Sequence, residues 1–319
     1  MLLLLSAACT GTSSPSPIQG PTPTHQPPAT SAAGPLRWSA GSPLPIAVSE
    51  VGVAALGTSI HVLGGYVGGH PGSTTHLVLD TTTGQWKTAA PLPKALDHVG
   101  AVALDGRVWA IGGYGSRPGG TTGVWAYDPG SDRWATKASL PAPRAAGVAV
   151  VLGGRIHYVG GKSNGRDVAE HDVYDPATDR WTTAAPMLVA RDHAAGAVVG
   201  GRLYIAAGRP HDLPDAEAYD PATDSWSTLP PLPLGRSSVA GASFRGRFVV
   251  LGGEHPAEQA VDVEVDAYDS VARRWTRLPD LPAGRQGIGA AVIGDSLYLP
   301  GGGPTGGGAR QSTSVFVLR

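Results

Sequence analysis

The chain has 319 residues and a formal net charge of −1, from 24 Lys and Arg against 25 Asp and Glu. This balance provides no basic surface for a nucleic-acid backbone or an anionic membrane, so neither is expected as a partner. The 46 Gly and 29 Pro are typical of many short strands joined by tight turns. Since Cys9 is the only cysteine, disulfides within the chain, thiolate zinc sites and a cysteine nucleophile in the folded body are excluded.

The N-terminal segment 1–9, MLLLLSAAC, is a short apolar run followed by small residues and Cys9. It resembles the end of a bacterial lipoprotein signal, in which the cysteine is lipidated and becomes the mature N-terminus. No Lys or Arg precedes the run, so we expect a basic segment upstream of this start. The resemblance implies export and a lipid anchor at the outer face of a bacterial membrane. An ordinary secretory signal, giving a secreted protein, and a disordered apolar tail remain alternatives.

Residues 10–35 consist almost wholly of Thr, Ser, Pro, Gly, Ala and Gln. Such a composition cannot bury a core, so we expect this segment to be an extended, solvated tether. A lipid-anchored Cys9 followed by a Pro-rich spacer would hold the remaining chain clear of a membrane surface.

After the tether, a unit of about 47 residues repeats six times. Its first marker is a tryptophan that recurs at intervals of 48, 48, 47, 45 and 49 residues, at Trp38, Trp86, Trp134, Trp181, Trp226 and Trp275. Its second marker is a glycine pair, found at 64–65, 112–113, 160–161, 252–253 and 301–302, and written Ala-Gly at 207–208. Self-similarity at this period predicts a repeat architecture rather than two ordinary domains.

Each unit is predicted to hold four short strands, which in the third unit are 145–152, 155–161, 171–175 and 180–184. An octapeptide joins the third strand to the fourth: YDPATDRW at 174–181, with copies at 127–134, 219–226 and 268–275 and a weaker one at 79–86. Asp-Pro begins a tight turn, and the Trp that follows is a large apolar side chain for packing against a neighbouring sheet. We therefore interpret the octapeptide as scaffold.

The glycine pair closes the second strand of each unit, where a missing side chain allows close backbone approach or a positive φ. In the fourth unit Ala207 replaces the first glycine. Ala tolerates a positive φ poorly. We therefore expect that the first position needs Gly because neighbouring atoms are close, and that the second needs Gly because its φ is positive.

A glycine pair, a Tyr-Asp and a Trp six residues after the Asp form the pattern of kelch repeats, which residues 36–319 resemble. The resemblance implies an all-β fold, a six-bladed kelch-type β-propeller with a central channel. Trp38 has no first three strands before it, and the segment 314–319, SVFVLR, has no fourth strand after it. The N-terminal strand is therefore expected to close the last blade.

A fold of this kind hosts enzymes and binding modules alike, so function is sought in the loops that emerge on one face. Two sets of positions on this face vary from blade to blade while the scaffold repeats. The mouth positions, directly after the glycine pairs, are Tyr66, Tyr114, Lys162, Arg209, Glu254 and Gly303. The ring positions, fourteen residues before each pair, are Glu50, His98, Ala146, His193, Ser238 and Gly287. A position free to vary in a repeat is a candidate for recognition.

From these sets and the arginines two residues before the ring positions we choose the candidate ligand-binding residues. They are Tyr66, Tyr114, Lys162, Arg209, Glu254, His98, His193 and Arg191. The alternative interpretation is that these Arg and His residues pack between blades and stabilise turns.

No metal or cofactor is expected. Asp97 with His98, and Asp192 with His193, offer ligand types but belong to alternate blades across the funnel. The Gly-rich segment 301–308 lacks the Gly-Lys-Ser/Thr ending of a phosphate loop, and the sequence has no nucleophile elbow, no HExxH and no zinc spacing.

The leading hypothesis is a monomeric, non-catalytic, extracytoplasmic binding module that presents its funnel to a glycan, peptide or protein. The alternative is an enzyme, since the chain is similar in size and export to bacterial kelch-type sialic acid mutarotases. Anomer exchange needs a base and an acid, for which Glu50, His193 and Glu254 are candidates, with Arg209 or Arg191 gripping a sugar carboxylate. A resemblance to galactose oxidase extends to the repeats only, because its copper site needs a Cys cross-linked to a Tyr and the folded body has no Cys.

Overall fold

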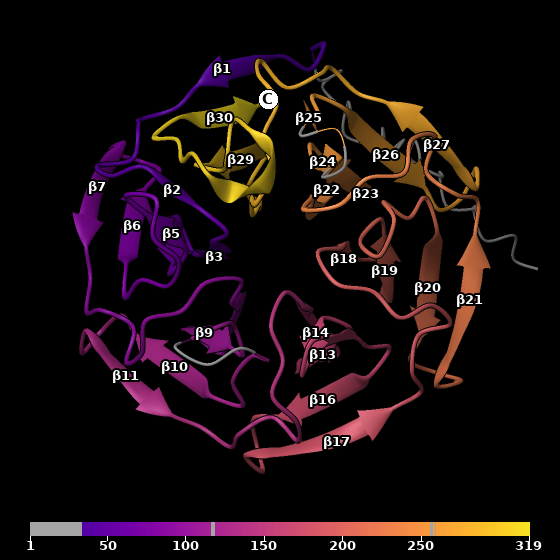
Figure 1. Cartoon of the computed structure of the whole chain (residues 1–319), viewed down its shortest axis with the longest axis horizontal. Coiled ribbons are helices and arrows are strands. Elements are labelled where there is room, and N and C mark those ends of the chain that lie inside the picture. The colour runs from indigo at the N-terminus through magenta and orange to yellow at the C-terminus, as the bar shows by residue number, and fades with distance from the viewer. Residues whose placement is uncertain (1–33, 116–118, 256–257, 259) are drawn as a thin grey trace, which may run out of the picture. The chain divides into compact units, whose positions relative to one another are not determined.

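The computed structural model describes residues 34–115, 119–255, 258 and 260–319, of which Leu36–Arg319 form one compact unit. The unit is a ring of six antiparallel four-stranded sheets, so the predicted six-bladed β-propeller is confirmed (Figure 1). The segment 1–9 with Cys9, and the tether up to residue 33, lie outside the described residues. Among the residues described, no helix has the length and apolar character needed to cross a membrane.

Each blade runs from an inner strand beside the central channel to an outer strand at the rim (Figure 1). In this order the first three blades contain β3 (Gly52–Leu56), β4 (Ser59–Leu63), β6 (His76–Asp80) and β7 (Gln85–Thr88); β8 (Gly100–Leu104), β9 (Arg107–Ile111), β10 (Val124–Asp128) and β11 (Arg133–Thr136); and β12 (Val148–Leu152), β13 (Arg155–Val159), β16 (His171–Asp175) and β17 (Arg180–Ala184). The other three contain β18 (Ala195–Val199), β19 (Arg202–Ala206), β20 (Ala216–Asp220) and β21 (Ser225–Leu229); β22 (Ala240–Phe244), β23 (Arg247–Leu251), β26 (Val265–Asp269) and β27 (Arg274–Arg277); and β28 (Ala291–Ile293), β29 (Ser296–Pro300), β30 (Val315–Leu318) and β1 (Trp38–Ala40).

Three short hairpins and one 3-10 turn complete the described elements. The hairpins are β2 (Val48–Ser49) with β5 (Tyr66–Val67), β14 (Lys162–Ser163) with β15 (Arg166–Asp167), and β24 (Glu254–His255) with β25 (Ala260–Val261). The 3-10 turn is η1 (Gly306–Gly308). Each hairpin includes a mouth position, so these elements build up the face on which the mouth opens.

The core is divided into six apolar clusters, and each cluster combines side chains of two neighbouring blades. The repeated tryptophan adds a polar link to each cluster, because its indole N–H donates to a carbonyl of the adjoining blade at 2.8 to 3.0 Å. These bonds are Trp38 to Pro279, Trp86 to Ser42, Trp134 to Ala90, Trp181 to Ala138, Trp226 to Ala185 and Trp275 to Pro230. Neighbouring blades are thus held by both packing and directional hydrogen bonds.

The octapeptide 174–181 shows why this stretch repeats. Asp175 accepts the N–H of Ala177 at 2.9 Å and closes the turn, while the hydroxyl of Tyr174 donates to Asp179 at 2.6 Å. Asp179 also accepts the N–H of Ala138 at 3.0 Å, so that it ties this turn to the blade before it. The interpretation as scaffold is confirmed, because these polar side chains are occupied by bonds within and between blades.

Both positions of the glycine pair have a positive φ, which corrects the expected division of roles. Gly160 has φ 61° and Gly161 has φ 96°, and a Cβ at either would lie 2.6 to 2.7 Å from a backbone carbonyl oxygen. Ala207 adopts φ 67° in the same place. The first position therefore combines crowding with the left-handed conformation, and the fourth blade accommodates a methyl group in it.

The N-terminal strand closes the last blade, as predicted. β1 pairs antiparallel with β30, with Trp38 opposite Leu318 and Ala40 opposite Phe316. The blade therefore joins the two ends of the described propeller and covers the edge of β30.

Two truncations test this closure. Removal of residues 1–34 keeps β1 and is expected to leave a soluble domain with a cooperative thermal transition. Removal of residues 1–42 deletes β1 and exposes the edge of β30, so we expect aggregation and a melting temperature lower by about 2 to 4 °C for each kcal/mol lost. Equal melting temperatures for the two truncations in circular dichroism would contradict the closure.

Candidate functional site

The six ring positions form a closed circle of backbone hydrogen bonds around the channel. All six have left-handed backbone conformation, with φ from 51° at His98 to 58° at Gly287. The N–H of each donates to the carbonyl of the ring position in the preceding blade at 2.7 to 3.1 Å, and the N–H of Glu50 closes the circle on Gly287. Because every blade contributes one donor and one acceptor, the circle fixes the ring residues relative to one another.

The mouth positions lie one layer further out. Each is bridged antiparallel to the residue just before the ring position of its own blade: Ser49 with Tyr66, Asp97 with Tyr114, Ala145 with Lys162, Asp192 with Arg209, Ser237 with Glu254 and Gln286 with Gly303. This pairing explains why positions sixteen residues apart in the sequence form one funnel.

The ring surrounds a cavity of about 100 Å³, which we call the throat. Behind the throat, a channel of about 400 Å³ runs between the inner strands and is lined mainly by Ala, Val and Gly. Gly147, Ala194, Val239 and Ile288 line both spaces. The lining side chains therefore change from polar at the mouth to apolar in the channel.

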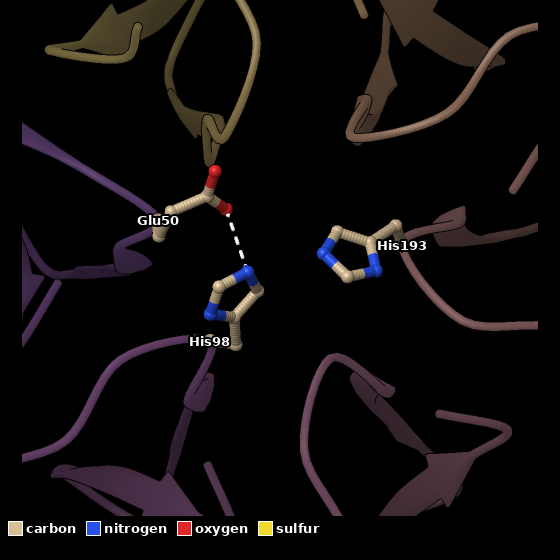
Figure 2. Close-up of side chains that lie close together, drawn as sticks. All are labelled: Glu50, His98 and His193. Carbon is tan, nitrogen blue, oxygen red and sulfur yellow. Dashed lines mark ion pairs between the residues drawn. The ribbon is translucent and has the colours of Figure 1, made fainter. Parts of the chain in front are cut away.

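Three side chains from different blades converge in the throat: Glu50, His98 and His193 (Figure 2). Nε2 of His98 lies 3.0 Å from Oε2 of Glu50, and its Nδ1 lies 2.6 Å from Oδ1 of Asp97. The rings of His98 and His193 are 4.8 Å apart between centroids and nearly perpendicular, at 75°. All three side chains are at least nine-tenths buried.

The environment sets different protonation states for these groups. Burial alone would raise the pKa of Glu50, but the charge and hydrogen bond of His98 outweigh it and hold the pKa at about 2. Burial would lower the pKa of His98, but Glu50 and Asp97 raise it to about 10. For His193, burial prevails and lowers the pKa. At neutral pH the throat therefore holds an ionised Glu50, an imidazolium at His98 and a neutral His193.

The glycine at ring position 287 makes room for the carboxylate. A Cβ at Gly287 would lie 2.5 Å from both Cδ and Oε1 of Glu50, closer than real side chains approach. Gly287 of the sixth blade has no side chain, and the carboxylate of Glu50 fills the space that a side chain would take.

Two half-buried tyrosines flank His98 at the mouth. Tyr66 and Tyr114 approach the imidazole edge-on, with ring centroids 5.8 and 5.3 Å away and interplanar angles of 72° and 77°. Burial raises the pKa of Tyr66 to about 12, so its hydroxyl stays protonated at neutral pH. The mouth therefore offers two aromatic surfaces that carry neutral hydroxyl groups.

Arg209 and Glu254 form one polar pair at the mouth. The guanidinium of Arg209 donates to Oε1 of Glu254 and, at 3.2 Å, to Oγ of Ser238. Oε2 of Glu254 also accepts the backbone N–H of Gly307 at 2.8 Å, and this side chain is only 1% exposed. Both carboxylate oxygens of Glu254 are thus occupied, so Glu254 positions Arg209 and the 3-10 turn.

Lys162 is paired in the same manner. Its Nζ lies 3.3 Å from a carboxylate oxygen of Asp167 and 3.3 Å from one of Asp192. Within the described residues, the three cations Arg209, Lys162 and His98 are each paired with carboxylates, which are Glu50, Asp97, Asp167, Asp192 and Glu254. The mouth therefore has no free basic group for an acidic ligand at these positions.

Arg191 does not line the mouth, which corrects its assignment as a ligand-binding residue. Its guanidinium is fully buried, pairs with Glu217 at 2.7 Å and donates to the carbonyls of Ala207 and Asp215. Arg144 and Arg236 make the same kind of buried pair with Asp172 and Asp266. For these arginines the alternative interpretation as packing residues is confirmed.

The structure brings together seven of the eight candidate ligand-binding residues and adds one carboxylate that the sequence did not single out. The seven occur at the throat and mouth, and Glu50 joins them from the candidate catalytic set. The added carboxylate is Asp167 on β15, which pairs with Lys162 across a short hairpin. Gly165, which follows Asn164 in the predicted loop, could have indicated this hairpin, because Asn-Gly favours a two-residue hairpin turn.

Comparison with known proteins identifies the repeat independently. A family model described as the KLHDC2/KLHL20/DRC7 Kelch-repeats domain matches residues 36–208, and a Kelch motif model matches residues 190–233. The solved structure titled "Structure of YjhT" is similar with a TM-score of 0.74 and 18% identity, covering 86% of this chain and 95% of that one. At this identity the likeness concerns the fold. The search of curated proteins gave no match.

Proposed function

Because the chain belongs to the kelch-repeat family, whose propellers serve in general as interaction modules, we propose that its mouth binds a neutral, hydroxyl-rich ligand of the glycan class. The observation that carries the proposal is that two half-buried tyrosines lie at the mouth beside cations that are each already paired with a carboxylate. We further propose that the module works outside the cytoplasm, because segment 1–9 resembles a lipoprotein signal and a Pro-rich tether follows it.

Charge compensation argues against an acidic ligand. A carboxylate arriving at Arg209 or Lys162 would lie close to Glu254 or Asp192, which are buried and already paired with these cations. Repulsion between like charges opposes such an approach. A neutral hydroxyl meets no such repulsion, because it can donate to the carboxylates and accept from the cations without displacing either.

The tyrosines supply the complementary apolar contact. Aromatic rings with one polar end pack well against the C–H faces of a sugar while the hydroxyl group remains in water. Tyr66 and Tyr114 stand on neighbouring blades on either side of His98, so one sugar ring can contact both.

Binding of a glycan array by the full-length chain tests the proposal. We expect selective binding of neutral glycans whose affinity is insensitive to salt. Tyr66→Ala combined with Tyr114→Ala should weaken it at least about tenfold, or about 1.4 kcal/mol. The matched control, Tyr66→Phe with Tyr114→Phe, keeps both rings and should retain most of the affinity. Binding only of acidic glycans, lost in Arg209→Ala with Lys162→Ala, or only of a peptide or protein, would contradict the proposal.

The alternative function is exchange of sugar anomers, which requires an acid and a base at the ligand. Of its three candidate groups, Glu50 and His193 share the throat, whereas Glu254 is occupied by three donors. Anomer exchange followed by NMR distinguishes the two functions. Acceleration by the wild type that is lost in Glu50→Gln would favour the enzyme over the binding module.

A further inference from the structure

We infer that the throat binds one divalent transition-metal ion of the zinc type through Glu50, His98 and His193. This site lies below the tyrosines and goes beyond the proposed glycan binding, on which it does not depend. It also departs from the expectation of no metal. That expectation assumed that the histidines face each other across a wide funnel, whereas the circle of ring positions brings their rings to 4.8 Å.

The donor set has the composition of an open zinc site. Two imidazoles and one carboxylate are three protein ligands of the kinds that Zn²⁺ binds, and they leave a fourth position for water or a ligand. One ligand atom from each of the three side chains lies within 4.8 Å of the others, so a small inward rotation of the side chains would surround an ion. Figure 2 shows the three groups pointing toward one point from three blades.

A carboxylate stands behind each imidazole. Nδ1 of His98 donates to Asp97 at 2.6 Å, which turns Nε2 into the throat toward Glu50. Asp192 lies 3.0 Å from Nδ1 of His193. A ligating histidine usually directs its second ring nitrogen to a carboxylate or carbonyl, which fixes the ring and strengthens it as a donor. In each of two blades, the Asp-His sequence thus supplies a histidine that can bind the metal ion and a carboxylate that holds this histidine in place.

His193 presents its imidazole to the throat. It is only 7% exposed, its Nδ1 lies beside Asp192, and the opposite side of its ring points toward Glu50 and His98 (Figure 2). A buried imidazole normally has a partner for each ring nitrogen. A metal ion between His193, His98 and Glu50 would be the partner of Nε2.

His98 lies between two carboxylates, with Nδ1 2.6 Å from Asp97 and Nε2 3.0 Å from Glu50. A divalent ion in the throat would replace the direct contact between Nε2 and Glu50 by a bond to each of these side chains. The site is also fixed in advance, because the ring of backbone hydrogen bonds holds the three ligating residues and Gly287 keeps the place of the carboxylate open.

Zinc titration of the full-length, chelator-treated chain by calorimetry tests the inference. We expect one Zn²⁺ per chain and no comparable binding of Mg²⁺, which prefers oxygen ligands. His193→Ala and Glu50→Gln should each weaken zinc binding at least about a hundredfold, beyond the range known for residues behind the ligands. The matched control is His255→Ala, because His255 also lies between two carboxylates, Asp212 and Asp262, but outside the throat.

Cobalt provides a second measurement that does not depend on how the variants fold. We expect Co²⁺ added to the wild type to give visible absorption bands of low-coordinate cobalt, which disappear when Zn²⁺ is added. Absence of saturable binding of either metal by the wild type overturns the inference. So does undiminished binding by both throat variants, shown to be folded by circular dichroism. Glycan binding is measured separately, in the presence of a chelator, so its outcome is distinguishable.

Discussion

Lowering the pH from 7 to 5 is expected to reduce the free energy of unfolding of the propeller by several kcal/mol. The cause is two buried histidine pairs: His61 with His76 at 2.9 Å in blade 1, and His157 with His171 at 2.7 Å in blade 3. Burial lowers the pKa of all four imidazoles, to about 3 for His61 and about 4 for His157 and His171.

The sign follows from the linkage of protonation to folding. An unfolded imidazole takes up a proton below about pH 6.5, while the folded one stays neutral down to its lowered pKa, so stability falls as the pH falls between these values. At pH 5 the loss is about 2 kcal/mol for each such imidazole. His98 offsets only a small part of this loss. Its raised pKa gives a contribution that is complete below pH 6.5 and is lost only as the pH rises toward 10.

Urea unfolding at a series of pH values measures this effect. The chain itself offers the matched variant, because blade 5 has Val249 and Val265 at the two positions that carry His157 and His171 in blade 3. The double change His157→Val and His171→Val should make the free energy of unfolding depend less steeply on pH. His70→Ala, at an exposed position, should leave this pH dependence unchanged. A dependence of the same steepness in all three proteins would contradict this explanation.

Replacing Asp266 by Ala is expected to destabilise the propeller by about 3 to 5 kcal/mol, because it leaves the guanidinium of Arg236 buried without its carboxylate. Arg236 is fully buried, bonds Asp266 at 2.9 Å and donates to the carbonyl of Gly252 at 2.8 Å. The control is Arg202→Ala, which removes the half-exposed partner of the ion pair with Asp220 and should cost no more than about 1 kcal/mol.

A double variant shows that the charge, rather than the packing, is responsible. Blade 1 has Val48 and Leu77 where blade 5 has Arg236 and Asp266. Arg236→Val with Asp266→Leu therefore introduces the apolar pair that blade 1 has at these positions. This double variant should recover a large part of the free energy of unfolding that Asp266→Ala loses. Urea unfolding that finds the double variant less stable than Asp266→Ala would contradict this view of the buried pairs.

The fold could be predicted because its determinants are local and repeated. Each Trp and each glycine pair has the same environment in every blade, so six copies identify one structural unit. Closure by β1 could also be predicted. The unit at Trp38 has a fourth strand without the first three, and the unit that ends at 314–319 has a third strand without a fourth. Ala207 departed from expectation, since its positive φ is imposed by the blade and not by its own preference.

The site could be predicted only in part, because its partners come from different blades. The sequence indicated the mouth positions, but not that Arg209 meets Glu254, 45 residues away, or that Lys162 meets Asp192. Such pairs depend on the tilt between adjacent blades, which no local pattern specifies. For the same reason the narrowing of the funnel at the throat was not apparent, and packing of Arg191 between blades was only the alternative interpretation.

Convergence of Glu50, His98 and His193 on one metal-binding point can be tested by a crystal structure of the zinc-loaded chain, with diffraction recorded on both sides of the zinc absorption edge. We expect one anomalous peak in the throat, about 2.0 to 2.2 Å from a carboxylate oxygen of Glu50 and from one nitrogen of each imidazole. A throat without a peak, with the three side chains directed to separate partners, would contradict this convergence.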